Sequence, residues 1–326
     1  MVEPLIPGGP APGDDAPVAR RVTIREVGAR DGLQAETPLS IEDRVRFLDA
    51  LSATGVAKIE AVSFVSPKAV PAMADAAAVW AGAERNPAVA YSALVPNRRG
   101  AEAAVEAGGF ASLQAFLAAA DGYNRKNVGK SVQESLEDVA DVVAFAREAG
   151  VDAECSISAA FGDPYDGDVA FERVLEVARV LAEVGVTGVS LGDTTGMATP
   201  WRVWRMVDLF QQELPALRLN LHFHDTRGLA MANVFAAWQL GATEFDASAG
   251  GLGGSPFAPG SNGNVATEDV VHLFADMGVV TGVNLDRVVE AAKLAEELVG
   301  HPVPGQVSKA GPRWRTQPAA DESEAE

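Results

Sequence analysis

The sequence predicts an α/β protein with the (β/α)8 TIM-barrel fold and one extra C-terminal helix. Between Arg21 and about Val299, segments rich in β-branched residues alternate with segments of helical periodicity. Such alternation is typical of a parallel sheet covered by helices, and eight repeats in about 260 residues match the usual size of a barrel. The alternative is an open, doubly wound sheet, but the sequence shows no Gly-x-Gly-x-x-Gly phosphate turn after the first predicted strand.

The predicted strands are short, apolar and bounded by turn residues. They span residues 22–27, 56–65, 89–95, 112–118, 151–159, 188–191, 217–225 and 245–249. The predicted helices have apolar residues at intervals of three and four. They span residues 40–52, 79–84, 101–107, 133–149, 170–184, 201–213, 229–240 and 267–277, and the extra helix spans 285–298. Ser40 is the expected N-cap of the first helix, and Gly150 is expected to end the fourth.

Composition and charge exclude several classes of protein. The formal net charge of -19 argues against nucleic-acid binding, which needs a basic surface. The single cysteine, Cys155, excludes a disulfide framework and a thiolate zinc site, and it fits a reducing compartment. No apolar run reaches the length that crosses a membrane. We therefore expect a cytoplasmic protein that binds neither nucleic acid nor membrane.

The two ends of the chain differ in composition from its middle. Residues 1–20 are rich in Pro, Gly, Ala and Asp and lack the apolar core of a signal peptide. Residues 304–326 are Pro-rich, polar and finally acidic. We expect a disordered leader over 1–20, one barrel domain over 21–303, and a disordered acidic tail over 304–326.

The predicted seventh strand carries two histidines on one face. Strand side chains alternate, so Asn220, His222 and His224 lie opposite Leu221 and Phe223. Successive residues on one face are roughly 6–7 Å apart, which lets both imidazoles reach one cation. The alternative is a pair of core histidines, but each ring would then need its own hydrogen-bond partner. We therefore favour a metal site.

Further polar residues follow strand ends, where barrels hold their active sites. Asp31 is a natural third metal ligand, and Gly28 is expected to bend the strand end so that Arg30 and Asp31 both point inward. This nitrogen and oxygen ligand set suits Mg²⁺ or Mn²⁺, with zinc or cobalt as substitutes. Glu60 lies in an apolar strand and needs a cation, for which Arg30 is the obvious candidate. Asp193 ends the sixth strand, which favours a catalytic role. The alternative for Asp31 is a surface turn with a loose salt bridge, and the alternative for Glu60 is a purely structural ion pair.

Two loops are candidates for ligand contact. The glycine-rich stretch Gly250–Gly254, followed by Ser255, can close over a site as a lid or serve as a plain turn. Arg125, Lys126 and Lys130 form the densest basic cluster, in the predicted loop after the fourth strand. On so acidic a chain this cluster indicates a phosphate-bearing ligand such as a CoA tail, or else an ordinary solvated loop.

Several motifs together carry a family resemblance. They are Glu-Val-Gly-Ala-Arg-Asp-Gly-Leu-Gln at 26–34, Ile-Glu at 59–60 with Ser-Phe-Val-Ser-Pro-Lys at 63–68, His-Phe-His-Asp-Thr at 222–226, Gly-Leu-Gly-Gly at 251–254 and Gly-Asn-Val-Ala-Thr-Glu-Asp at 263–269. In order and spacing these motifs resemble the 3-hydroxy-3-methylglutaryl-CoA (HMG-CoA) lyase family, from about residue 21 to about 299. Related synthases look more like Asp-Gly-Glu-Gln where this chain has Asp-Gly-Leu-Gln.

The resemblance implies roles for individual residues. The implied metal ligands are Asp31, His222, His224 and Asn264. Arg30 matches the arginine that steadies the thioester enolate, Glu60 its carboxylate neighbour, and Asp193 an acid/base carboxylate. The implied substrate-lining residues are Gln34, Asn127 and Ser190.

One position departs from the family pattern: Ser255 stands where the lyases have a cysteine that takes part in proton transfer. A hydroxyl is a far weaker acid than a thiol, whose pKa is about 8.5, so Ser255 could relay a proton only through water.

The resemblance implies a metal-dependent retro-Claisen lyase that cleaves HMG-CoA to acetyl-CoA and acetoacetate, as in leucine degradation and ketone-body metabolism. It is compatible with a homodimer. The alternatives are a citramalyl-CoA or 3-alkyl-3-hydroxyglutaryl-CoA lyase, and a metal-binding barrel without catalysis.

Overall fold

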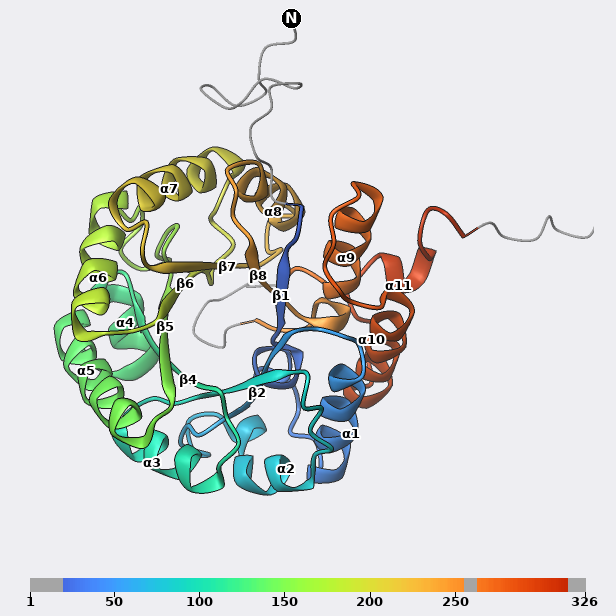
Figure 1. Ribbon diagram of the computed structural model, residues 1–326, viewed down its shortest axis with the longest axis horizontal. Coiled ribbons are helices and arrows are strands. Elements are labelled where there is room, and N and C mark those ends of the chain that lie inside the picture. Colours follow the sequence, from blue (N-terminus) through green and yellow to red (C-terminus); the bar gives the residue numbers. More distant parts are fainter. Residues whose placement is uncertain (1–19, 255–262, 316–326) are drawn as a thin grey trace, which may run out of the picture.

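The computed structural model describes residues 20–254 and 263–315, and they form a (β/α)8 barrel. Eight parallel strands follow one another around the barrel in chain order, and the last strand pairs with the first to close it. Figure 1 shows the helices as an outer ring around this sheet. The predicted fold class is therefore confirmed.

The strands and helices lie close to their predicted positions. The strands are β1 (Thr23–Glu26), β2 (Lys58–Ser63), β3 (Ala90–Leu94), β4 (Ser112–Ala118), β5 (Asp152–Ser158), β6 (Gly188–Asp193), β7 (Arg218–Phe223) and β8 (Glu244–Ala247). The predicted helices appear as α1 (Ile41–Ser52), α2 (Ala76–Gly82), α3 (Arg98–Ala107), α5 (Val132–Ala149), α6 (Phe171–Val184), α7 (Pro200–Glu213), α8 (Ala230–Gln239), α9 (Thr267–Asp276) and α10 (Leu285–Val299).

Local sequence signals set the ends of these helices. Ser40 is the N-cap of α1, and its hydroxyl accepts a hydrogen bond of 3.1 Å from the Asp43 N–H. Such a cap satisfies one of the free N–H groups of the first turn. Gly150 ends α5 in the left-handed conformation, with φ of 71°, which glycine adopts without steric cost. Both sequence predictions are confirmed.

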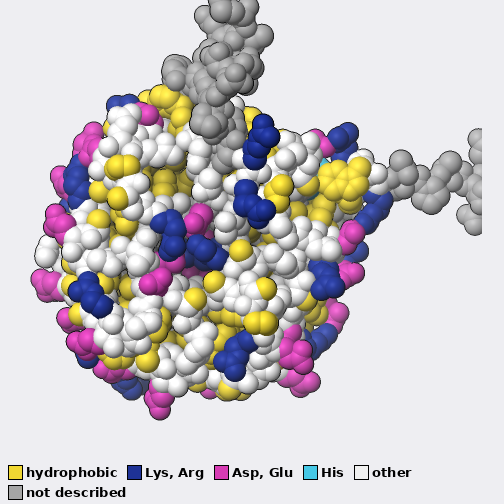
Figure 2. Space-filling view, viewed as in Figure 1, with side chains coloured by type: hydrophobic (Ala, Val, Ile, Leu, Met, Phe, Trp, Pro, Cys, Tyr) yellow, Lys and Arg dark blue, Asp and Glu magenta, His cyan; other side chains and the backbone are white. Residues whose placement is uncertain are grey.

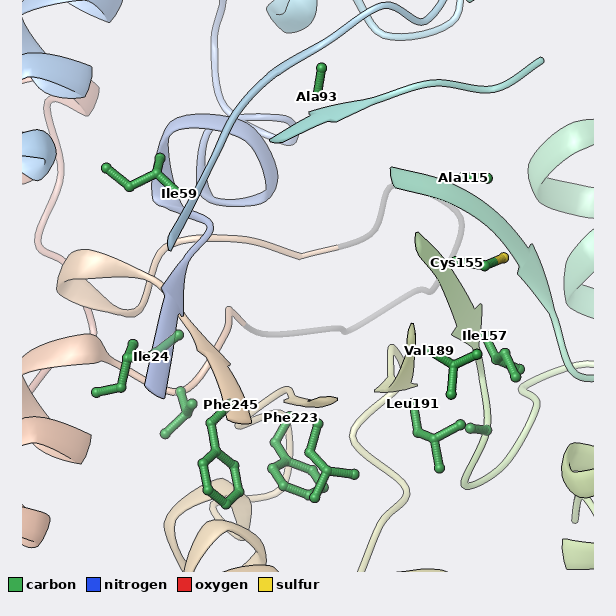
Figure 3. Close-up of a cluster of buried hydrophobic side chains, with 14 of the residues drawn as sticks. Ile24, Ile59, Ala93, Ala115, Cys155, Ile157, Val189, Leu191, Phe223 and Phe245 are labelled. Atoms are coloured by element: carbon green, nitrogen blue, oxygen red, sulfur yellow. The ribbon is translucent and has the colours of Figure 1, made fainter. Parts of the chain in front are cut away.

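The apolar face of each strand packs against the surrounding helices. Figure 3 shows the outward-pointing side chains of this layer. They include Ile24, Ile59, Ala93, Ala115, Cys155, Ile157, Val189, Leu191, Phe223 and Phe245, all of which are buried. Because strand side chains alternate, this packing turns the residues between them, including those of the histidine face of β7, toward the barrel interior.

The barrel interior is polar and its charges are paired. Arg25 donates two hydrogen bonds to Asp246, at 2.7 and 2.8 Å, and one of 3.3 Å to Glu154. At the N-terminal ends of β2 and β8, Lys58 and Glu244 form an ion pair of 2.6 Å. Charged side chains of both signs also gather at the centre of the face in Figure 2. A layer of paired charges therefore lies beneath the C-terminal ends of the strands.

The prediction of a loop after β4 is wrong, because most of this segment forms a helix, α4 (Asp121–Val128). Its residues are largely polar, so it lacks the apolar periodicity of a packed helix. Side-chain bonds hold it instead: Asn124 is buried, accepts from the Ala118 N–H at 2.8 Å and donates to the Lys130 carbonyl at 2.9 Å.

The prediction of a disordered tail from residue 304 is wrong for residues 304–315. They include a short helix, α11 (Val307–Ala310), and the Asp269 carboxylate of α9 accepts from the Val307 N–H at 2.7 Å. The Gly305 N–H donates to the Gly250 carbonyl at 2.9 Å. These bonds give backbone N–H groups of the segment partners within the fold, which its composition alone does not predict. Residues 316–326 and the predicted leader, except Arg20, lie outside the described residues.

Candidate active site

Asp31, His222 and His224 come together at the C-terminal ends of β1 and β7. The Nε2 atoms of the two histidines are 3.0 Å apart, and Oδ2 of Asp31 lies 3.8 Å from each. The side chains are only 7%, 11% and 2% exposed for Asp31, His222 and His224. Three donor atoms of mixed nitrogen and oxygen type thus surround one point, which makes this group a candidate site for a divalent metal.

A single turn of π-helix after β1, Gly28–Gly32, carries Arg30 and Asp31 into the barrel mouth. The Val27 carbonyl accepts from the N–H groups of Asp31 at 2.7 Å and of Gly32 at 3.1 Å. A Cβ on Gly28 would lie 2.7 Å from Oε1 of Glu26, which is closer than real contacts allow. The expectation that Gly28 bends the strand end, so that both side chains point inward, agrees with this geometry.

Asn264, from the segment before α9, lies beside Asp31. Its Nδ2 donates to Oδ2 of Asp31 at 2.7 Å and to the Leu252 carbonyl at 3.0 Å. Its Oδ1 is buried and has no hydrogen-bond partner within residues 20–254 and 263–315. A buried amide oxygen normally has a partner, and a hard cation would supply one. The residues present therefore fit a divalent metal with Asn264 as a fourth ligand.

Arg30 lies beside this site, between two carboxylates. Its Nε donates to Glu60, which is completely buried in β2, and its NH1 donates to Asp31 at 2.6 Å. Burial alone would lower the pKa of Arg30, but the carboxylates of Glu60 and Asp31 outweigh it and raise the pKa. The pairing of Arg30 with Glu60 that we expected from the sequence is thus present.

Asp31 is held ionised by its neighbours. Burial alone would raise the pKa of its carboxyl group, but the charges of Arg30, His222 and His224 outweigh burial and lower the pKa to about 2. The carboxylate is therefore ready to bind a cation throughout the neutral range.

A cavity of about 110 Å³ opens beside these residues. Gln34, Asn127 and Ser190 all line it, together with Arg30, Asp31, His222 and His224. Gln34 donates to Oδ1 of Asp31 at 2.8 Å. The remaining lining residues are Ser63, Val65, Val70, Met73, Leu94, Phe116, Tyr123, Ser156, Ser158, Gly192 and Thr194. The cavity thus combines charged and hydroxyl groups with apolar side chains.

The basic cluster lies outside this cavity. Arg125 and Lys126 are exposed on α4, and neither lines the cavity, although Asn127 of the same helix does. Arg125 forms an ion pair of 3.0 Å with Asp121, and Lys130 pairs with Asp138. The structure therefore places these basic side chains on the surface rather than against the candidate metal site.

Asp193 ends β6, but its carboxylate is turned partly toward the backbone. Oδ1 accepts from the N–H groups of Met197 at 2.7 Å and Ala198 at 2.9 Å. Oδ2 is buried without a hydrogen-bond partner in the part of the chain that the structure describes. Burial raises the pKa of Asp193 to about 7, against the opposing effect of the two backbone hydrogen bonds. The group can therefore exchange a proton near neutral pH.

Ser255 lies outside the described residues, whereas the glycine-rich stretch Gly250–Gly254 lies within them. The described part of the loop reaches the site, because the Gly254 carbonyl accepts from Nε2 of Gln34 at 3.4 Å. The lid and the role of Ser255 stay predictions.

Sequence reasoning missed Asp246 of β8. Its Oδ2 lies 3.0 Å from Nδ1 of His222, and its carboxylate also pairs with Arg25. A charged residue between the apolar Phe245 and Ala247 is the same kind of signal that identified Glu60.

The chain is similar to known proteins over most of its length. The family profile described as HMGL-like matches residues 21–295. The hydroxymethylglutaryl-CoA lyase YngG of Bacillus subtilis is 45% identical, over 89% of this chain and 97% of its own. A 3-hydroxy-3-isohexenylglutaryl-CoA/hydroxymethylglutaryl-CoA lyase of Pseudomonas aeruginosa is 42% identical over the same shares.

A solved structure gives the same result for the fold. The HMG-CoA lyase of Acinetobacter baumannii, in complex with coenzyme A and 3-methylmalate, superposes with a TM-score of 0.88 at 36% identity. The match covers 92% of this chain and 98% of that one. From these matches over nearly the whole barrel, we conclude that the chain belongs to the HMGL-like family and is a carbon–carbon lyase.

Proposed function

We propose that the chain catalyses the metal-dependent retro-Claisen cleavage of HMG-CoA, or of a close 3-hydroxyacyl-CoA analogue with a distal carboxylate. For HMG-CoA the products are acetyl-CoA and acetoacetate. One observation carries the proposal: Arg30 donates at 2.6 Å to Asp31, so a buried guanidinium lies directly beside the candidate metal group in the same cavity. Such a pairing can hold a hydroxy-acid group and stabilise a developing enolate side by side.

Asp31, His222, His224 and Asn264 would hold the cation, for which we propose Mg²⁺ or Mn²⁺ because two of the four ligands are oxygens. When bound, such a cation orients oxygen groups of a substrate and lowers the pKa of a hydroxyl group. Gln34, Asn127 and Ser190 would contact the substrate from the cavity wall.

Asp193 is the proposed acceptor of the tertiary hydroxyl proton. Its pKa of about 7 suits a base near neutral pH, and its Oδ2 is free of protein partners among the described residues. The bond between the carbinol carbon and the carbon next to the thioester then breaks. Its electron pair passes to the thioester as an enolate, and the carbinol becomes a ketone.

Arg30 would donate to the enolate oxygen, and Glu60 would hold the guanidinium in place. A proton must finally reach the enolate carbon. We propose that water delivers it, with Ser255 at most as a relay, because a hydroxyl is a poor direct acid.

A substrate panel tests the function. Protein loaded with Mg²⁺ or Mn²⁺ is offered HMG-CoA, citramalyl-CoA and a 3-alkyl-3-hydroxyglutaryl-CoA, and released CoA thioester and ketone are measured. We expect cleavage of HMG-CoA or of the 3-alkyl analogue, a second candidate that the dual activity named for the P. aeruginosa relative favours. Metal binding without cleavage of any member would instead support the non-catalytic barrel.

Assembly and location are part of the same proposal. We propose an acyl-CoA-binding homodimer in the cytoplasm, which size-exclusion chromatography with light scattering and cell fractionation would test. Among the described residues, no helix combines the length and apolar character that spanning a membrane requires.

A further inference from the structure

We propose that Asp246 is a positioning residue, which fixes the single proton of neutral His222 on Nδ1 and so aims the Nε2 lone pair at the metal group. The purpose of this arrangement rests on the proposed function, but its geometry does not. Asp246 would touch neither the metal nor the substrate and would act only through His222.

The sheet places the two side chains next to each other. His222 of β7 and Asp246 of β8 are partners in the strand register, so their side chains lie on the same face of adjacent strands. Oδ2 of Asp246 lies 3.0 Å from Nδ1 of His222. An ionised carboxylate can only accept hydrogen bonds, so the hydrogen must belong to Nδ1.

Asp246 is itself held firmly. It is 3% exposed, and Arg25 binds it through two parallel hydrogen bonds of 2.7 and 2.8 Å. Asn220 donates at 2.7 Å and Ser190 at 3.4 Å to the same carboxylate. The paired guanidinium keeps the carboxylate ionised, and four donors other than His222 leave it little freedom to turn.

The other ring nitrogen of His222, Nε2, then has the lone pair that a metal ligand needs. Nε2 of His222 is the atom that lies 3.8 Å from Oδ2 of Asp31 and 3.0 Å from Nε2 of His224. A neutral imidazole has one proton, so a proton on Nδ1 leaves a lone pair on Nε2. Loss of such an outer partner typically lowers metal affinity by about 10–100-fold.

Nuclear magnetic resonance of metal-free wild-type protein tests the tautomer directly. The chain has only 4 histidines, so ¹⁵N-histidine labelling gives few signals, and His222→Asn identifies the relevant one. At a pH high enough to leave the imidazole of His222 neutral, we expect a proton on Nδ1 and none on Nε2. A proton on Nε2 overturns the proposal. This measurement needs neither activity nor a variant of Asp246.

Two variants test the consequence for metal binding. Asp246→Asn can present an N–H to Nδ1 and so shift the proton to Nε2. Glu154→Gln is the matched control, because the Glu154 carboxylate also accepts from Arg25, at 3.3 Å, and its other partner is Arg218 rather than a candidate ligand.

Titration calorimetry with Mn²⁺ should show a 10–100-fold loss of affinity for Asp246→Asn, and a loss of less than about threefold for Glu154→Gln. Equal affinities of the two variants overturn the proposal. If wild-type protein binds no Mn²⁺, the proposed function fails, while the tautomer of His222 still decides the role of Asp246. If Asp246→Asn does not fold, the wild-type spectrum alone decides it.

Discussion

Replacing Arg30 with glutamine should damage both catalysis and stability, for separable reasons. The stability loss follows from Glu60, which is completely buried and loses the cation that pairs with it. Leaving one partner of a buried ion pair without the other typically costs about 3–5 kcal/mol. We therefore expect a clear fall in the free energy of unfolding for Arg30→Gln, measured by urea denaturation.

The catalytic loss follows from the enolate. Removing a donor that stabilises a developing oxyanion typically lowers kcat by about 10²–10³-fold. Because the enolate forms only in the transition state, KM should change much less than kcat. Steady-state kinetics of HMG-CoA cleavage measure both constants. Saturating Mg²⁺ is used because Arg30→Gln could also weaken metal binding through the neighbouring Asp31.

A double variant separates the two effects. Glu60→Gln combined with Arg30→Gln removes both charges, so no ion is left buried alone and much of the lost stability should return. The enolate would still lack its donor, so kcat should stay low. Recovery of kcat in the double variant would show that Arg30 acts only through the stability of the fold, and near-normal kcat in Arg30→Gln would refute the catalytic role outright.

Three further predictions concern the metal, the loop and a buried carboxylate. Chelation should abolish thioester cleavage and added Mn²⁺ or Mg²⁺ should restore it, whereas full activity in metal-free protein contradicts the mechanism. On the preferred substrate, Ser255→Ala should leave kcat nearly unchanged and Ser255→Cys should raise it little. A large rise in kcat for Ser255→Cys on HMG-CoA, with no other acyl-CoA cleaved by the wild-type protein, would indicate a family enzyme limited by its proton donor. Burial raises the pKa of Glu268 from 4.5 to about 8, so the folded state binds a proton that the unfolded state releases, and stability should fall as pH rises across that interval. Glu268→Gln should flatten this fall in urea unfolding, and an unchanged slope would refute the assignment.

The fold and the clustering of Asp31, His222 and His224 could be predicted because both depend on local patterns. Eight alternations of apolar strand and amphipathic helix leave few architectures open. At the end of β7, the period of two places His222 and, one residue beyond the strand, His224 on one face, and this depends on the local sequence alone. Asp31 could be added because barrels gather the ends of their strands at one mouth.

The parts that could not be predicted depend on contacts between distant segments. Asp246 and Arg25 are 221 residues apart in sequence, and only the closed barrel makes them neighbours. The polar helix α4 is held by bonds of the buried Asn124 rather than by an apolar stripe. The order of residues 304–315 comes from backbone bonds to Gly250 and Asp269, which composition does not reveal.

Closure of the barrel is also what assembles the candidate site. Asp31 follows the first strand and Asn264 follows the last, so they meet only because β1 pairs with β8. Glu26 strengthens this seam, because its Oε1 accepts from the N–H groups of both Gly28 at 2.7 Å and Ala249 at 3.1 Å. The same carboxylate therefore holds the turn that carries Asp31 and the segment after β8. The positions of the candidate metal-binding side chains are thus set by the same contacts that join the two ends of the sheet.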